Sequence, residues 1–315
     1  MKESGTQLSK LMDAVSFHIS TRIKICDNQD YTYFKEHPFI RLSDSEYGVL
    51  SNIFVANLIY IKLKFCIRDI CKDNNICNFF TYFNNDFIEK YLFINILKYS
   101  FSAPCYICLS ENDCLRYITT VNKKDRDSLP DGYVRHQNNI LLFECKGKII
   151  SVSAMQDEKK CRADIGDVVG RKGTGQLIKN CDRIIQNNCF WDNTIPSNYV
   201  IYPILVLDDS GFSSSGFNRY VIEQTQDYVN HNRSHVFPFT VLDIDTFILI
   251  ADLINNNEVD IFREIESYHS YINGQGAYES VEELFLSSNI SFAAFIKSRY
   301  ETKSPSIIDE WNKNL

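Results

Sequence analysis

The sequence predicts an α/β protein whose mixed sheet is covered by helices. Residues 199–207 are almost wholly apolar, as in a central strand that is buried on both faces. Residues 140–152 form a second strand-like run, and residues 86–99 carry the apolar side chains of a buried helix. The composition, 44% hydrophobic and 23% charged over 315 residues, is typical of a folded protein with a sizeable core.

Residues 1–84 are predicted to be mainly helical, with strands. A strand is expected within residues 15–25, and the apolar residues of 46–72 predict a helix that Ser43 or Asp44 would cap.

Residues 85–254 are predicted to hold the central sheet. Asn84, Asn85 and Asp86 offer caps for the helix over residues 86–99. The expected strands span residues 103–109, 115–121, 133–136, 140–152, 199–207 and 239–243, and the expected later helices span residues 176–186 and 246–254. Residues 166–175 contain four glycines among polar residues and predict a mobile loop. The remaining segment, residues 255–315, is predicted to be helical and acidic.

The overall net charge of −7 conceals an asymmetry along the chain. Residues 114–183 contain 14 basic and 9 acidic side chains, a net charge of +5, whereas residues 184–315 have a net charge of −11. A local positive potential attracts phosphate even on an acidic protein, although charge alone favours a solvated surface as the explanation of such a segment.

The sequence points to a reduced compartment and away from the membrane. No secretory signal is expected from the first residues, and no run of eighteen residues is apolar enough to span a bilayer. The eleven cysteines include one CxxC pair, Cys105 and Cys108, without a second pair to complete a zinc site. We therefore expect a cytoplasmic protein with free thiols.

The chemistry is concentrated in three charged residues of one predicted hairpin. Along the strand, Glu144 and Lys146 share a face with Ile140 and Leu142, and they interrupt an otherwise apolar segment. A two-residue turn at positions 137–138 would place Asp131 opposite Glu144, and a turn at positions 138–139 would place it opposite Lys146. Either register brings the three side chains to one face.

Two converging carboxylates suit Mg²⁺ or Mn²⁺, and a neighbouring lysine can orient an attacking water or stabilise charge on a phosphorus centre. The simpler alternative is a cross-strand salt bridge among Asp131, Glu144 and Lys146.

The motif Pro130-Asp131, twelve residues, then Glu144-Cys145-Lys146 resembles that of the PD-(D/E)XK nuclease superfamily. The resemblance covers roughly residues 85–250. It implies a restriction-endonuclease-like fold: a mixed central sheet flanked by helices, here with extra, mainly helical N-terminal and C-terminal segments.

The resemblance also implies roles for individual residues. Asp131, Glu144 and the backbone carbonyl of Cys145 would bind the metal, and Lys146 would position or activate the water. The glutamate that the family often carries on an upstream helix corresponds to Glu89, which would hold a metal-bound water or a second metal, with Glu111 as the alternative. Gln176 corresponds to a glutamine that many members carry on the helix after the ExK strand, and it would orient Lys146 or contact the substrate backbone. Phosphate contacts are expected from basic residues nearby: Lys148, Arg171, Lys172 and Lys179.

The function expected from this resemblance is metal-dependent endonuclease activity, with DNA favoured over RNA and a role in host antiviral defence or restriction. A non-catalytic subunit that keeps the nuclease fold, and an unrelated α/β protein with a fortuitous motif, are the alternatives. Because no helix-turn-helix or zinc finger is evident, targeting by a helicase or ATPase partner is expected. Residues 1–80 and 255–315 would provide partner contacts or the interface of a homodimer. The sequence contains no P-loop, GxGxxG, GxSxG or HExxH motif.

Overall fold

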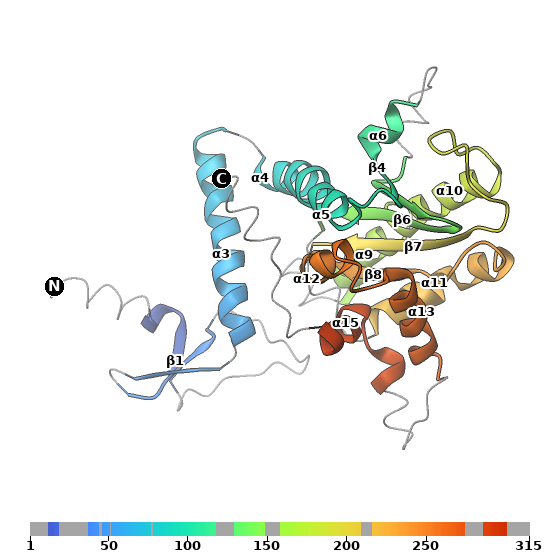
Figure 1. The fold of residues 1–315 in the computed structure, drawn as a ribbon. Coiled ribbons are helices and arrows are strands. Elements are labelled where there is room, and N and C mark those ends of the chain that lie inside the picture. The colour runs from blue at the N-terminus through green and yellow to red at the C-terminus, as the bar shows by residue number, and fades with distance from the viewer. Residues whose placement is uncertain are drawn as a thin grey trace. The chain divides into compact units, whose positions relative to one another are not determined.

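The computed structural model describes residues 12–18, 37–43, 46–50, 52–76, 78–117, 129–148, 158–208, 216–274 and 286–300 (Figure 1). The chain forms two compact units. The first comprises Met1–Tyr82 with Ser151–Arg162, and the second comprises Phe83–Ile150 with Ala163–Leu315. All the candidate site residues predicted from the sequence belong to the second unit.

The first unit contains a small sheet and a long helix. β1 (Ser16–His18) lies parallel to β2 (Phe39–Arg41), which pairs antiparallel with β3 (Tyr47–Val49). α3 (Asn52–Asp73) and the short α4 (Phe79–Thr81) follow. β1 lies within the strand expected at residues 15–25, of which residues 19–25 are outside the described part of the chain.

The helix predicted over residues 46–72 is wrong at its start. Residues 47–49 form β3 instead, because their aromatic and β-branched side chains suit a strand that can pair with β2. Ser43 does not cap the helix, since its amide donates to the carbonyl of Glu46 in the turn between the two strands. The other predicted cap, Asp44, lies outside the described residues.

The second unit is built on a five-stranded mixed sheet in the order β4-β5-β6-β7-β8. β4 (Ile107–Ser110), β5 (Gly132–His136) and β6 (Asn139–Lys146) pair antiparallel. β6, β7 (Val200–Leu207) and β8 (Thr240–Asp243) pair in parallel. This sheet, with helices around it, confirms the predicted α/β class.

The hairpin between β5 and β6 has the first of the two predicted registers. Gly132 pairs with Phe143, and His136 pairs with Asn139 across a two-residue turn. Gln137 in that turn has a φ of 55°, the left-handed conformation that tight hairpin turns require. Continued by one residue, this register places Asp131 opposite Glu144.

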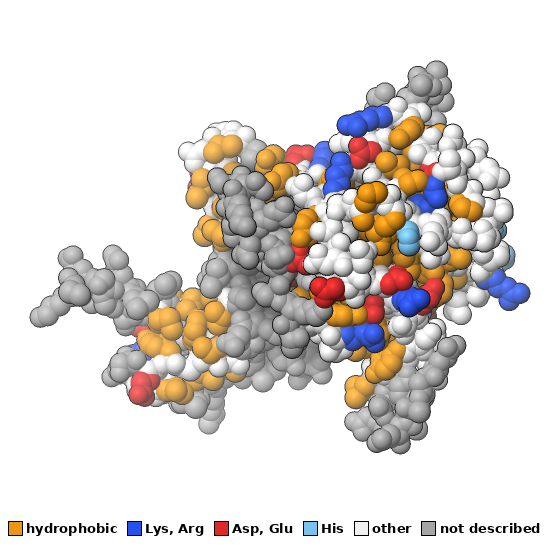
Figure 2. All heavy atoms as spheres, in the orientation of Figure 1, with side chains coloured by type: hydrophobic (Ala, Val, Ile, Leu, Met, Phe, Trp, Pro, Cys, Tyr) orange, Lys and Arg blue, Asp and Glu red, His pale blue; other side chains and the backbone are white. Residues whose placement is uncertain are grey.

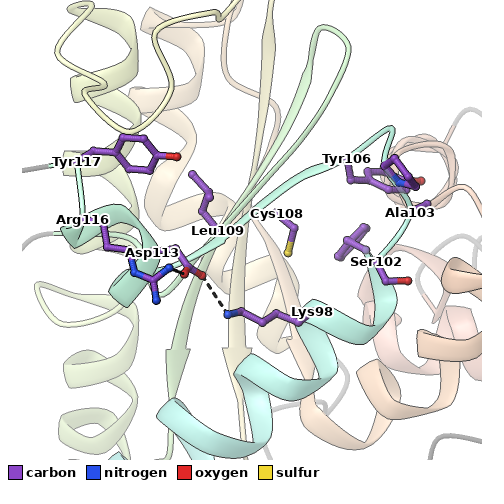
Figure 3. Close-up of a pocket in the computed structure, with 11 residues that line it drawn as sticks. Lys98, Ser102, Ala103, Tyr106, Cys108, Leu109, Asp113, Arg116 and Tyr117 are labelled. Carbon is purple, nitrogen blue, oxygen red and sulfur yellow. Dashed lines mark ion pairs between the residues drawn. The ribbon is translucent and has the colours of Figure 1, made fainter.

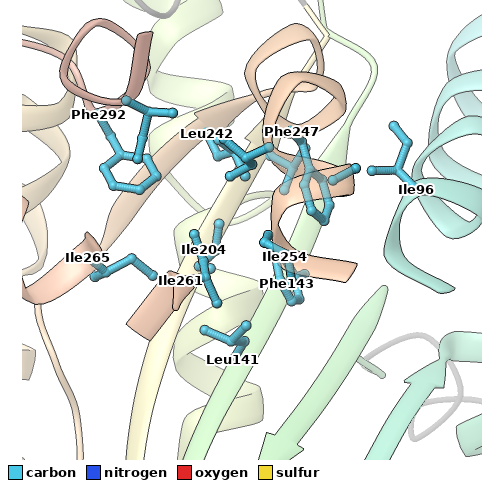
Figure 4. Packing of buried hydrophobic residues seen from close by; sticks show 14 of the residues in the cluster. Ile96, Leu141, Phe143, Ile204, Leu242, Phe247, Ile254, Ile261, Ile265 and Phe292 are labelled. Atoms are coloured by element: carbon cyan, nitrogen blue, oxygen red, sulfur yellow. The ribbon is translucent and has the colours of Figure 1, made fainter. Parts of the chain in front are cut away.

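Helices cover both faces of the five-stranded sheet (Figure 1). On one face, Leu141, Phe143 and Cys145 of β6 belong to the larger of two hydrophobic clusters. The helices that contribute to it include α5 (Phe93–Ser100), α12 (Ile244–Asn255), α13 (Ile261–Ile272) and α15 (Phe292–Tyr300). Figure 4 shows Phe143 beside Phe247 of α12, whose rings stack with centroids 5.9 Å apart.

On the opposite face, Ile140 and Leu142 belong to the second cluster. This cluster includes side chains of α9 (Glu158–Val169), α10 (Thr174–Ile185) and α11 (Phe217–His231). Both clusters include side chains of β7, which is buried along almost its whole length. The predicted central strand at residues 199–207 is therefore confirmed.

The helix before β4 begins earlier than predicted. The π-helix η1 (Tyr82–Leu92) leads directly into α5. The predicted caps Asn84, Asn85 and Asp86 therefore lie inside a helical segment. Asn78 is the cap of α4 instead, and its side chain accepts a hydrogen bond from the amide of Thr81.

Two other predictions need correction. The segment 166–175 is mostly helical, because Gly166 lies inside α9 and Thr174 begins α10. The strand expected at residues 115–121 is wrong at its start, where Leu115 ends α6 (Glu111–Leu115); residues 118–121 lie outside the described chain. α11 was not predicted at all.

The eight cysteines whose side chains the structure describes are free, and Cys145 is buried in the core. Among the described helices, none has the length and apolar character needed to cross a membrane.

Candidate active site

The site lies at the carboxyl end of β6, where the strand brings charged side chains into an apolar face. Glu144 and Lys146 lie on the same face of β6 as Ile140 and Leu142, which belong to the second hydrophobic cluster. The side chain of Glu144 is 0% exposed and that of Lys146 is 19% exposed. A carboxylate buried so deeply needs a compensating cation or hydrogen-bond donors.

Asp131 is held beside this pair by the hairpin. Its carboxylate oxygen Oδ2 accepts a hydrogen bond of 2.7 Å from the backbone amide of Cys145. The same oxygen lies 3.7 Å from the ammonium nitrogen of Lys146. The three residues singled out from the sequence are therefore brought together.

The ammonium of Lys146 lies among three oxygens. Its Nζ is 2.6 Å from Oε1 of Glu144 and donates to the backbone carbonyl of Cys145 at 3.0 Å. Asp131 is the third partner, at the longer distance. The Lys146 ammonium approaches Glu144 outside hydrogen-bond geometry. Within the described residues, neither carboxylate oxygen of Glu144 therefore has a hydrogen-bond donor.

Burial and neighbouring charges shift the pKa values of all three side chains. Burial raises the pKa of Glu144 well above its usual range, and the nearby Asp131 adds to this rise while Lys146 opposes it. Burial also raises the pKa of Asp131, against the opposing effects of Lys146 and the Cys145 amide. Burial alone would lower the pKa of Lys146, but the surrounding carboxylates raise it overall.

Glu89 reaches the same end of β6 from η1. Its Oε1 accepts a 3.0 Å hydrogen bond from the amide of Gly147. Burial raises the pKa of Glu89, and the charge of Asp131 adds to this rise. The ammonium of Lys146 and the hydrogen bond from the Gly147 amide oppose it. These electrostatic interactions place Glu89 in the neighbourhood of the Asp131–Lys146 pair.

Gly147 is required for this approach. A Cβ atom at position 147 would lie 2.8 Å from the Cα and Cβ atoms of Asn84 in η1, closer than such contacts occur. The side-chain oxygen of Asn84 is buried and has no hydrogen-bond partner. The sequence did not predict that Gly147 and Asn84 belong to the site. The only indication was that a glycine directly follows the ExK triplet.

Glu111, the alternative upstream acid, is positioned differently. It begins α6, and its backbone amide donates to the carbonyl of Asp131 at 3.3 Å. Both Glu111 and Glu89 raise the pKa of Lys90, but Glu89 also interacts with Lys146. The geometry therefore favours Glu89 as the acid that completes the site.

Gln176 lies in the first turn of α10, which packs against β6 and β7, and it is half-buried. α9 lies between β6 and α10 in the chain, so Gln176 is on the second described helix after the ExK strand, and the role that the resemblance implies for it stays a prediction.

The basic residues expected to contact phosphate divide into two groups. Lys148 and Lys172 each lie 3.1 Å from Oδ2 of Asp167 in α9, so one carboxylate holds two ammonium groups. These two lysines lower the pKa of Asp167. Arg171 and Lys179 are exposed. Asp167 was not anticipated, because the sequence predicted a loop where α9 ends.

The donor set has the chemistry that suits a small divalent cation. Two carboxylates and a backbone carbonyl are the hard oxygen ligands that Mg²⁺ and Mn²⁺ select, and Oε2 of the buried Glu144 has no partner. Within the described part of the chain, however, no group of three or more His, Cys, Asp or Glu side chains is arranged to hold a metal ion.

A separate hollow of about 490 Å³ lies beside β4 (Figure 3). Its charged lining residues are paired, since Asp113 lies 3.1 Å from Lys98 and 3.4 Å from Arg116. Its lining includes no residue of the Asp131–Lys146 site. On the face shown in Figure 2, the basic side chains are interspersed with acidic and apolar ones.

Comparison with known proteins adds no relative. No family model matches the chain, and neither the search of curated proteins nor that of solved structures gives a match.

Proposed function

We propose that the chain is a divalent-metal-dependent phosphodiesterase that cleaves nucleic acid, with DNA favoured over RNA. The observation that carries the proposal is Glu144: a fully buried carboxylate that shares one cation with Asp131 and the Cys145 carbonyl and leaves an oxygen without a partner. A site that is only structural gains little from a buried acid left in this state.

The residues of the site have complementary roles in such a reaction. Asp131, Glu144 and the Cys145 carbonyl would hold Mg²⁺ or Mn²⁺, which supplies Lewis-acid polarisation of the phosphate and a water of lowered pKa. Lys146 would stabilise the negative charge that develops on the phosphate oxygens. Glu89, held by the Gly147 amide, would orient the attacking water.

The polyanionic substrate is inferred from the basic side chains that follow β6 and join α9 to α10. Lys148, Arg171, Lys172 and Lys179 would contact phosphates in the part of the sequence that carries the positive excess. The preference for DNA rests on the resemblance to PD-(D/E)XK nucleases alone.

A second candidate is a non-catalytic nucleic-acid-binding or scaffold subunit with the same fold. It is favoured by the ion pairs of Lys146 with both acids, which compensate part of their negative charge without a metal. The two candidates agree on nucleic-acid binding and differ on hydrolysis.

Cleavage assays decide between them. Supercoiled plasmid, linear duplex, single-stranded DNA and structured RNA would be incubated with Mg²⁺, Mn²⁺ or EDTA. We expect metal-dependent cutting by the wild type and a loss of about 100-fold or more in Asp131→Asn and Glu144→Gln. Asp113→Asn is the matched control, because Asp113 is also an ion-paired acid but lies outside the site. Nucleic-acid binding without cleavage on any substrate would favour the scaffold subunit.

A further inference from the structure

The position of Lys146 has a consequence for how the site takes up a cation. Its ammonium is within 2.6 Å of Glu144 Oε1, 3.0 Å of the Cys145 carbonyl and 3.7 Å of Asp131 Oδ2. These are the three oxygen donors that would hold a divalent ion. The ammonium therefore occupies the point at which the donors converge.

The ammonium and a divalent ion cannot share this point. Metal–oxygen contacts of Mg²⁺ are about 2.1 Å long, so an ion on Glu144 would lie within a few ångströms of a nitrogen that contacts the same oxygen. At that separation, in a mostly buried site, the repulsion between the two cations is large. One cation must leave before the other enters.

Lys146 has a route by which it can leave. Its side chain is 19% exposed, as is that of Asp131, whereas Glu144 is sealed from solvent. A lysine has four methylene groups with rotatable bonds, so its ammonium can move to the exposed side without movement of the backbone.

We propose that the ammonium of Lys146 holds the point where these oxygen donors converge, and that a divalent metal binds by displacing this ammonium from Glu144 and the Cys145 carbonyl. The exchange involves no proton or electron transfer: the ammonium stays charged and moves toward solvent. This inference rests on the proposed function, because it assumes that the same oxygens bind the metal. It goes further in assigning Lys146 an inhibitory effect on metal affinity beside its role toward phosphate.

The test is a titration with Mn²⁺ at fixed pH and ionic strength, followed by calorimetry and by the melting temperature. We expect Lys146→Met to bind Mn²⁺ about tenfold or more tightly than the wild type, since the competing cation is gone. Its melting temperature in EDTA should be lower, and the rise on adding Mn²⁺ larger, than in the wild type.

Two further variants separate competition from simple loss of charge. Lys148→Met removes an equal charge two residues along, where the ammonium pairs with Asp167 rather than with the donors. It should leave Mn²⁺ affinity within about twofold of the wild type. Lys146→Gln also removes the ammonium and should bind tightly too, which covers the case in which Lys146→Met does not fold.

The outcomes distinguish this inference from the proposed function. Mn²⁺ affinity that is unchanged or weaker in Lys146→Met and Lys146→Gln, or equally raised in Lys148→Met, overturns the displacement even if the wild type cleaves DNA. Tighter Mn²⁺ binding in the two Lys146 variants supports it even if the wild type cleaves nothing. Absence of Mn²⁺ binding in every variant also overturns it.

Discussion

The ammonium of Lys146 lies 2.6 Å from a carboxylate oxygen of Glu144, but only Glu144 is completely shielded from solvent. The two partners of this ion pair are therefore not equivalent. If its partner is removed, Lys146 keeps Asp131, the Cys145 carbonyl and access to water. Glu144 in the same situation keeps no cation in contact among the residues that the structure describes.

This asymmetry predicts unequal effects on stability in EDTA at neutral pH. Lys146→Met should cost about 3–5 kcal/mol of unfolding free energy, because it leaves a buried carboxylate unpaired. Glu144→Gln should change stability by only about 1 kcal/mol in either direction, because it also removes the cost of burying that charge. Urea unfolding of both variants measures the difference, and a larger loss in Glu144→Gln would contradict it.

The contact between Gly147 and η1 predicts that a single methyl group disturbs the site. Gly147→Ala should destabilise the protein by about 1–3 kcal/mol, since the new Cβ meets the backbone of Asn84 at 2.8 Å. It should also weaken Mn²⁺ binding and any cleavage, because the Glu89 side chain is held by the same amide.

Gly166→Ala is the control for this variant. Nothing lies within 4 Å of a Cβ at position 166, inside α9, so alanine should be neutral or stabilise by up to about 1 kcal/mol. Thermal unfolding and Mn²⁺ titration of the two variants test the pair. Equal behaviour of the two would show that the packing of η1 on Gly147 does not matter.

The shared carboxylate of Asp167 predicts a gain of nucleic-acid binding on its removal. Asp167→Asn releases the ammonium groups of Lys148 and Lys172 from a competing anion, so affinity for duplex DNA should rise severalfold at low salt. The slope of affinity against salt should become steeper.

Fluorescence anisotropy at several salt concentrations measures both effects. Glu223→Gln removes an equally exposed ion-paired acid from α11, which pairs with Arg219, and should leave the affinity nearly unchanged. If Asp167→Asn bound no more tightly than this control, Lys148 and Lys172 would not be phosphate contacts.

The elements that the sequence predicted well are those with strong local patterns. Strand alternation placed Glu144 and Lys146 on one face. The polar turn residues left two registers open for the hairpin, and the structure has the first, with the turn at residues 137–138. Residues 199–207 are apolar on both faces, a pattern that favours a central strand, and β7 has that position.

The misplaced elements are those in which packing overrides local preference. Gly166 lies in a helix although glycine favours loops, because tertiary contacts outweigh a propensity difference of about 1 kcal/mol. The loop prediction in turn hid Asp167, since only a helix ending at residue 169 brings its carboxylate to Lys148. The approach of Asn84 to Gly147 depends on η1 being a π-helix, for which the sequence carries no signal.

His269 provides a prediction that is independent of the proposed activity. Its side chain is almost fully buried in the second unit, and Nε2 shares a 2.9 Å hydrogen bond with Thr240 while Nδ1 has no partner. Burial lowers the pKa of His269 to about 3. In the unfolded chain the imidazole recovers its ordinary pKa of about 6.5.

Because the folded state binds this proton less readily, stability is fully present above about pH 6.5 and is lost as the pH falls toward 3. The expected loss approaches 1.4 kcal/mol per pH unit in that window. His269→Phe keeps an aromatic ring beside Phe237 and Tyr268 but cannot be protonated, so its stability should depend less on pH. Urea unfolding in EDTA at pH 5.0 and 7.5 tests this, and an equal pH dependence in the two proteins would mean that another group titrates.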